Sequence, residues 1–149
     1  MNHPNETHNT PEMDIVIQQW QTCVEMANNV SQRRDTMNNL FVTLNLALTA
    51  AISVLWDFKT MFLLVSGAAL CILWIRSINN FKHLNKEKFQ VIFLLEEKMA
   101  LQPFTKEWDY LKDNRKYQDG TRLELWLPKM FIVLYVVIAL IILAQKFFC

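Results

Sequence analysis

Three long runs of apolar residues divide the chain, at positions 39–56, 60–75 and 127–144. The first two contain no Asp, Glu, Lys or Arg, and the third contains only Lys129, near its start. Each run is slightly shorter than the roughly 20 residues that cross a bilayer, so its ends must extend into the flanking sequence. Tryptophans, which are enriched at membrane–water interfaces, lie at the ends of the runs: Trp56, Trp74 and Trp126. The pattern predicts three membrane spans.

The polar segments beside the first two runs carry apolar residues three and four positions apart, the spacing of a helix. Residues 10–12 supply an N-cap threonine, a proline at the first helical position and an acid in the first turn, which favours a helix start there. No proline follows before position 103, so one helix can run to Trp56. A short turn at 57–59 then returns the chain into a second helix that reaches about Ala100, and two such helices pack antiparallel.

We therefore predict an all-α integral membrane protein. A long antiparallel helical hairpin spans the membrane and extends into the cytoplasm, and a separate C-terminal membrane helix follows it. The expected short helix between them is capped by Thr105, and Pro128 restarts the last helix near its first turn. The predicted parts are a disordered leader at 1–10, the hairpin at 11–100 with spans 39–56 and 60–75, a cytoplasmic short helix and loop at 101–126, and the membrane helix at 127–149.

Basic residues are distributed unevenly around the apolar runs. Arg33 and Arg34 precede the first run, and ten Lys or Arg residues lie at 76–126. Only Lys59 marks the first turn, and only Lys146 lies at the C-terminal end. The positive-inside rule therefore predicts a cytoplasmic N-terminus, a cytoplasmic 76–126 segment and a C-terminus on the outer side.

Composition argues against several classes of protein. The net charge of +1 gives no overall attraction to nucleic acid. The three cysteines, Cys23, Cys71 and Cys149, have no ligand-like spacing, so we expect no disulfide framework, no metal site and no cofactor. The sequence also shows no phosphate-binding glycine loop and no nucleophile beside a base, so we expect that the protein is not an enzyme.

One polar stripe follows the first apolar run at intervals of four and seven residues, so its members stay on one side of a helix. An amide that faces hydrocarbon without a partner is costly, so this stripe must face protein or water. One alternative is hydrogen bonding to the second span, whose small residues at 66–69 permit close approach. The other is the lining of an opening in an oligomer. The stripe consists of Arg34, Asn38, Asn45, Thr49 and Ser53.

A basic collar is expected where the hairpin enters the cytoplasm, because antiparallel pairing brings residue 34 beside residue 82. Such a collar anchors a protein to anionic lipid. Repeated around a ring, it would instead form an electropositive vestibule that meets RNA or selects anions, and we leave direct RNA binding open. The collar consists of Arg33, Arg34, Arg76, Lys82 and His83.

Arg76 and His83 also match the arginine–histidine spacing of one class of metal-independent RNases. In that hypothesis His83 is the general acid or base and Arg76 stabilises charge on the phosphorus centre. The two residues are seven positions apart, about 10 Å along a helix, so one protomer cannot bring both to one phosphate. The simpler interpretation is that Arg76 extends to the lipid headgroups and His83 is a solvated helix residue.

Several segments carry a resemblance to a known family. SQRRDTMNN, FVTLNLALT, RSINNFKHLNKEKFQVI, LEEKM, PFTKEW and LELWLPKMF occur in order between Ser31 and Phe131. In these segments the chain resembles the RipA-like octameric membrane proteins of bacteria, which include the membrane accessory protein of type VI-B CRISPR systems. The resemblance implies a homo-oligomeric ring, an octamer, in the bacterial inner membrane. The CRISPR accessory protein is described as an assembly with a pore, which suggests a functional link to an RNA-guided nuclease. The role is left open between antiviral defence and the growth of an intracellular pathogen, with which the eponymous protein is associated.

These observations give three hypotheses of function. The first is a pore-forming or membrane-perturbing accessory whose partners are lipid and further copies of itself. The second is a membrane-tethered RNase that uses Arg76 and His83. The third is a non-conducting membrane scaffold for a cytoplasmic partner.

Overall fold

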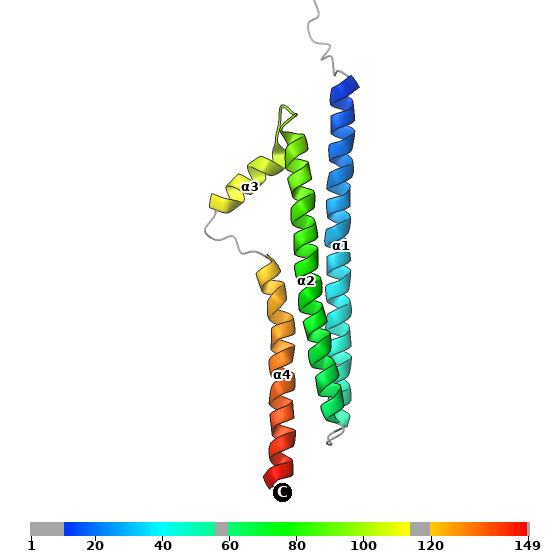
Figure 1. The fold of residues 1–149 in the computed structure, drawn as a ribbon, viewed down its shortest axis with the longest axis vertical. Helices are drawn as coiled ribbons and strands as arrows, with labels where there is room; N and C mark the ends of the chain where they lie inside the picture. The colour runs from blue at the N-terminus through cyan, green and yellow to red at the C-terminus, as the bar shows by residue number, and fades with distance from the viewer. Residues whose placement is uncertain (1–10, 56–59, 114–119, 149) are drawn as a thin grey trace, which may run out of the picture. The chain divides into compact units, whose positions relative to one another are not determined.

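The computed structural model describes residues 11–55, 60–113 and 120–148, and all of its regular secondary structure is helical. Four helices follow one another along the chain (Figure 1), and three of them are long and apolar enough to cross a membrane, which confirms the all-α membrane fold. The helices are α1 (Pro11–Val54), α2 (Thr60–Glu96), α3 (Pro103–Asp113) and α4 (Gly120–Phe148).

The two long helices begin where the sequence predicts and end earlier. α1 starts at Pro11, with Glu12 in its first turn, and ends at Val54. The predicted leader at 1–10, Trp56 and the predicted turn at 57–59 lie outside the described residues. α2 ends at Glu96 instead of Ala100, because the backbone turns there: the N–H of Met99 donates to the carbonyl of Glu96 at 2.9 Å.

The two later helices correct the predicted boundaries. α3 starts at Pro103, where a proline fits the first helical position, so Thr105 lies inside the helix and does not cap it. α4 starts at Gly120, so the C-terminal helix does not begin at 127 and part of the expected loop is helical. Pro128 therefore lies within α4 and not at its start. Its side chain is fully buried, and membrane helices tolerate an internal proline where neighbouring helices surround it.

The chain forms two compact units. The first contains the described parts of Met1–Val30 and Leu84–Tyr117, and the second contains the described parts of Ser31–His83 and Gln118–Cys149. Each unit has its own packing and is described separately.

Aromatic rings hold the first unit together. The rings of Trp20 on α1 and Phe104 on α3 are 5.7 Å apart between centroids. Phe104 also meets Phe89 of α2 edge-on at 5.8 Å, and Phe89 lies 6.1 Å from Phe93. One α3 ring thus joins all three helices of this unit, and such pairs contribute about 0.5–1.5 kcal/mol beyond their burial.

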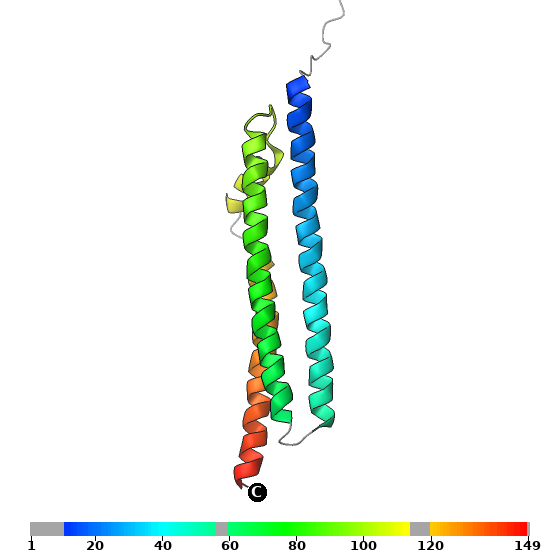
Figure 2. The same cartoon turned by 45° about the vertical axis from the view of Figure 1, so that its right-hand side comes forward.

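The second unit is a bundle of three helices, in which α4 and the neighbouring part of α1 pack on α2 (Figure 2). One buried cluster joins Ile52 of α1, Leu64 of α2 and Ile142 of α4. A second cluster joins Phe41 and Trp74, whose rings stack at 5.7 Å, and includes Ile78. All three candidate membrane spans contribute to this unit.

Candidate functional site: the polar faces of the membrane helices

The centre of the second unit is a buried amide, Asn45 of α1, whose side chain has no exposed surface. Its Nδ2 donates to the carbonyl of Phe41 at 2.8 Å. Its Oδ1 accepts from the hydroxyl of Tyr135 on α4 at 2.8 Å and from the thiol of Cys71 on α2 at 3.2 Å. One amide therefore links all three helices of the bundle, and it faces no opening of the protomer.

The ring of Tyr135 reaches this amide because α2 has a glycine opposite it. A Cβ atom placed on Gly67 would lie 2.6 Å from Cε2 of Tyr135, which is far inside normal contact distance. Gly67 therefore supplies the space that the tyrosine fills. Tyr135 and Cys71 were missed as partners of Asn45, since each is an isolated residue in an apolar run and spacing does not show which helix faces it.

The other members of the predicted polar stripe also have partners in the protomer. Oδ1 of Asn38 accepts from Nε1–H of Trp74 at 2.8 Å. Arg34 forms an ion pair with Glu124 of α4, and both side chains are about one fifth exposed. The sequence predicted Trp74 at the membrane–water interface, but it is fully buried in the bundle, and Glu124 was not singled out in the sequence.

Two further residues of the stripe bond to α1 itself. The hydroxyl of Thr49 donates to the carbonyl of Asn45 at 2.8 Å, and that of the exposed Ser53 donates to the carbonyl of Ala50 at 2.7 Å. Asn38, Asn45 and Arg34 thus contact α2 or α4 within the protomer, whereas Ser53 stays exposed. A side chain buried within one protomer does not line an opening between protomers.

A second stripe of exposed side chains, four of them polar, follows another face of α1. Its members are three and four positions apart, so they follow one face of the helix. The hydroxyl of Thr36 donates to the carbonyl of Gln32 at 3.0 Å, and that of Thr43 to the carbonyl of Asn39 at 2.9 Å. We call this the outer face of α1; it consists of Gln32, Thr36, Asn39, Thr43, Ala47 and Ala50.

The exposed side of α4 has the opposite character. Every large exposed side chain between positions 130 and 141 of α4 is apolar. Such a surface matches lipid hydrocarbon, whereas exposed Asn39 and Thr43 do not. The apolar side of α4 consists of Met130, Val133, Leu134, Val136, Val137, Leu140 and Ile141. The exposed side of α4 is thus apolar throughout, whereas the outer face of α1 carries exposed amides and hydroxyls and lies beside the exposed Leu40 and Leu46.

Most of the predicted basic collar is exposed. Arg33, Arg76, Lys82 and His83 have exposed side chains, whereas Arg34 is partly buried and paired with Glu124. Arg76 and His83 both lie on α2, seven positions apart, as predicted from the sequence. Among the described residues, no group of three or more His, Cys, Asp and Glu side chains could hold a metal ion.

A buried carboxylate organises the first unit. Oε1 of Glu96 accepts from the N–H of Phe104 at 3.0 Å and from Nε1–H of Trp20 at 3.3 Å. Its Oε2 accepts from the N–H and the hydroxyl of Thr105, at 2.9 and 2.8 Å. Glu96 therefore caps the start of α3, in place of the cap that we predicted at Thr105.

These hydrogen bonds also set the acidity of Glu96. Burial by itself raises the pKa of the carboxyl, but the bonds from Phe104, Thr105 and Trp20 together outweigh burial and hold the pKa below its ordinary value. The first unit thus stabilises the ionised form of Glu96 over the protonated form.

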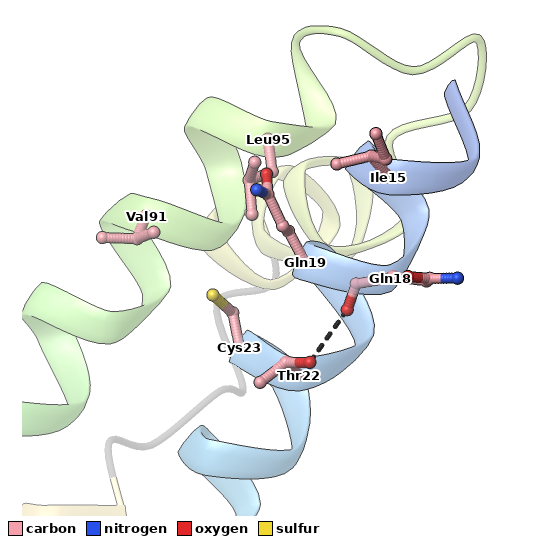
Figure 3. Close-up of a pocket in the computed structure, with 7 residues that line it drawn as sticks. All are labelled: Ile15, Gln18, Gln19, Thr22, Cys23, Val91 and Leu95. Carbon is pink, nitrogen blue, oxygen red and sulfur yellow. Dashed lines mark hydrogen bonds between the residues drawn. The ribbon is translucent and has the colours of Figure 1, made fainter. Parts of the chain in front are cut away.

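The first unit also contains a groove between α1 and α2 (Figure 3). The sulfur of Cys23 and the side chain of Leu95 point into it from opposite helices, and Thr22 donates to the carbonyl of Gln18 at 2.9 Å. The groove is lined by Ile15, Gln18, Gln19, Thr22, Cys23, Val91 and Leu95.

A comparison with known families identifies the chain. The model of the octameric membrane protein family (8xMP) matches residues 17–144, which is most of the 149-residue chain. The chain therefore belongs to this family, and it is a multi-pass membrane protein. No curated protein matches it, and no solved structure does.

Proposed function

We propose that this member of the octameric membrane protein family forms a ring around a water-filled opening, and that the outer face of α1 lines that opening. The observation that carries the proposal is the exposure of Asn39 and Thr43 in the protomer, at the start of the apolar run of α1. The family description supports the assembly of copies. A conducting opening and its lining are our inference.

Lipid is a poor neighbour for this face. A polar group in hydrocarbon without a partner costs several kcal/mol in the limit, so repeated amides and hydroxyls favour water or protein. The apolar side of α4 supplies a surface that suits lipid. With α4 toward lipid, the outer face of α1 is free to turn toward the ring axis.

The hydroxyls on this face suit a wet surface. Thr36 and Thr43 each donate to a carbonyl of their own helix, so their oxygens keep acceptor capacity for water without needing a partner helix. Ala47 and Ala50 continue the face with small side chains, which leave room along it. Eight copies of such a face would surround a narrow, uncharged, hydrated path.

We further propose that opening of this path perturbs the bacterial inner membrane as an accessory step of antiviral defence. The sequence resemblance to RipA-like proteins motivates the setting and the functional link to an RNA-guided nuclease. In this proposal the protein changes the state of the membrane and the nuclease acts on nucleic acid. Deletion of the protein is expected to weaken defence by the nuclease while leaving its RNA cleavage in vitro unchanged.

A cytoplasmic N-terminus is part of the same proposal, since it follows from the distribution of Lys and Arg. Single cysteines at the exposed positions Gln21 and Gln90, in a background without native cysteines, are expected to resist an impermeant thiol reagent in intact cells. They should react after the cells are opened. Labelling of Gln90→Cys in intact cells would show that the protein has the opposite orientation in the membrane.

We also propose that the protein acts without catalysis. Arg76 and His83 lie seven positions and about two helical turns apart on α2, so one protomer does not bring both to one phosphate. His83→Ala is therefore expected to retain full protection in a defence assay. Loss of protection with normal membrane insertion and oligomer size would favour the RNase hypothesis.

Conductance of the purified assembly tests the central proposal. Thr43→Leu makes the lining apolar and favours dewetting, so we expect severalfold lower single-channel conductance at unchanged oligomer size. Val137→Leu, on the apolar side of α4, is the matched control and should conduct as the wild type does. A wild-type assembly that does not conduct, or equal conductance of both variants, would refute the proposal.

A further inference from the structure

One face of α4 changes from basic to apolar along the helix. Its residues are three, four and seven positions apart, so they follow one another on one side of α4. All of their side chains are exposed, and those of Trp126, Val136 and Leu140 are 66%, 52% and 60% exposed. The face therefore offers a cationic end and an apolar end to one neighbour. We call it the α4 stripe; it consists of Arg122, Trp126, Lys129, Val136 and Leu140.

The basic end of the α4 stripe lies where the helix enters its apolar run. The run begins at position 127, so Arg122 precedes it by five positions, or about 8 Å along the axis. The headgroup layer of a bilayer is roughly 5–7 Å thick on each side, so Arg122 is level with its outer edge. Lys129 lies inside the run, but helix side chains tilt toward the N-terminal end, so its amine can reach the same layer. Trp126 lies between the two and is a residue type that is enriched at this depth.

The positive charge of the α4 stripe faces no acidic residue of its own helix. Glu124 is the only Asp or Glu in α4, and it pairs with Arg34 of α1. It is two positions from Arg122 and therefore lies on the other side of the helix. Neither Arg122 nor Lys129 forms an ion pair with another described residue. Two cationic side chains at the level of the lipid headgroups are thus available to an external anion.

We propose that the α4 stripe binds one anionic phospholipid, whose phosphate contacts Arg122 and Lys129 and whose acyl chain lies along the apolar end. Guanidinium and ammonium groups form charge-assisted hydrogen bonds with phosphate oxygens. Two cations without an opposing acid also favour a lipid with a net negative charge over a zwitterionic one. The proposal rests on the proposed function only in that α4 faces lipid, and it does not depend on conduction.

The length of the apolar end suits an acyl chain. Leu140 lies eleven positions beyond Lys129, or about 16 Å along the axis, and one leaflet contains roughly 15 Å of hydrocarbon. A single phospholipid therefore supplies an anion and an apolar chain in the same order in which the α4 stripe presents their partners.

Native mass spectrometry of the purified assembly, titrated with phosphatidylglycerol or phosphatidylcholine, tests the site. We expect the wild type to bind phosphatidylglycerol more tightly, and Lys129→Gln and Arg122→Gln each to bind this lipid about fivefold more weakly. Lys129→Arg keeps the charge and should bind as the wild type does. Lys98→Gln removes an exposed lysine of the first unit and is the control for net charge. Equal affinity of the wild type for both lipids, or no greater loss in Lys129→Gln than in Lys98→Gln, would overturn the proposal.

Glycerol phosphate distinguishes a lipid site from a phosphate site. It carries the phosphate without acyl chains, so it should not displace phosphatidylglycerol from the wild-type assembly. Displacement of the lipid by glycerol phosphate would show that the acyl chain adds no affinity and would overturn the proposal. An assembly that binds phosphatidylglycerol as expected but does not conduct would refute only the proposed function.

Discussion

At the scale of single residues, Asn45 and Glu96 have the same task in different surroundings. Each is fully buried, and each gathers hydrogen bonds from separate helices. Asn45 receives the hydroxyl of Tyr135 and the thiol of Cys71, whereas Glu96 receives donors from α1 and α3. A buried polar group without a partner costs about 1–3 kcal/mol, so both residues make one helix arrangement more stable than others.

Asn45→Leu is expected to destabilise the protomer and leave the conductance of surviving assemblies unchanged, because Asn45 is enclosed by its own bundle. The loss should be about 0.6–2 kcal/mol, the usual range for hydrogen bonds between membrane helices. Tyr135→Phe removes the donor of a hydrogen bond whose acceptor Asn45→Leu removes, so the double variant should unfold little earlier than the worse single variant. Thermal unfolding in detergent checks both effects. Additive losses in the double variant would show that the two residues act independently.

Glu96 predicts how the first unit responds to acid. Its pKa is lowered in the folded protein, so its contribution to stability is fully present above the ordinary pKa of glutamate. That contribution disappears as the pH falls through the lowered pKa. A proton then binds one of the two carboxylate oxygens, and that oxygen can no longer accept both of its hydrogen bonds. Hydrogen exchange at Phe104 and Thr105 is therefore expected to accelerate only in strong acid.

Glu96→Gln should weaken the start of α3 at neutral pH, as protonation of Glu96 does in acid. The amide places an NH2 group against donors that Glu96 accepts, so α3 should loosen by about 1–3 kcal/mol. Glu97→Gln, one position later and exposed, is the control and should exchange as the wild type does. Exchange at Thr105 that is unchanged in Glu96→Gln would contradict the capping role.

At the scale of elements, α1 differs from the other two membrane helices because it carries amide side chains on two of its faces. The inner side contains Asn38 and Asn45, which α2 and α4 occupy. The outer side contains Asn39 and Thr43, which remain exposed. The helix thus supplies both an anchor for its own bundle and a hydrophilic surface for the assembly.

The close approach of α2 and α4 depends on Gly67. Gly67→Ala would bring a methyl group to within 2.6 Å of the Tyr135 ring, so the ring must move away from Asn45. We expect a loss of about 1–3 kcal/mol, the usual cost of overpacking, and a smaller loss when Tyr135 is also replaced by Phe or Leu. Ala68→Gly is a control at the adjacent position. A stable Gly67→Ala protein would show that the helices separate without cost.

The pattern of apolar residues was enough to predict the helices and their approximate ends. It predicted the start of α1 at Pro11 and three membrane spans, because burial and backbone chemistry leave direct traces in sequence. It failed at Thr105 and Pro128. The cap of α3 comes from Glu96, seven positions before the helix, and the proline lies inside α4 among neighbouring helices.

The polar stripes show a different limit of the sequence. Spacing placed Asn45 on one face of α1 but did not indicate what that face contacts, since Tyr135 lies ninety positions away. Spacing alone also did not show which amides of α1 are buried and which are exposed. Asn38 and Asn39 are neighbours in sequence, but they lie on different faces of the helix. Only packing distinguishes the buried amide from the exposed one.

At the scale of the whole molecule, we assign neighbours to particular surfaces of the protomer. The apolar side of α4 meets lipid, the basic end of the α4 stripe meets the lipid phosphate, and the outer face of α1 meets water at the ring axis. Lipid binding and conduction can therefore be lost separately. Lys129→Gln should weaken the binding of phosphatidylglycerol, whereas Thr43→Leu should keep the octamer and lower its conductance.

Block of current by a thiol reagent tests the lining of the opening most directly. Thr43→Cys and Val133→Cys are made in a background whose native cysteines are replaced, and each octamer is recorded before and after a charged methanethiosulfonate reagent is added. The account predicts that current through Thr43→Cys falls steeply, because eight charged groups enter the path, while current through Val133→Cys on α4 is unchanged. Block at Val133→Cys with none at Thr43→Cys would contradict it and would place α4, not α1, at the axis.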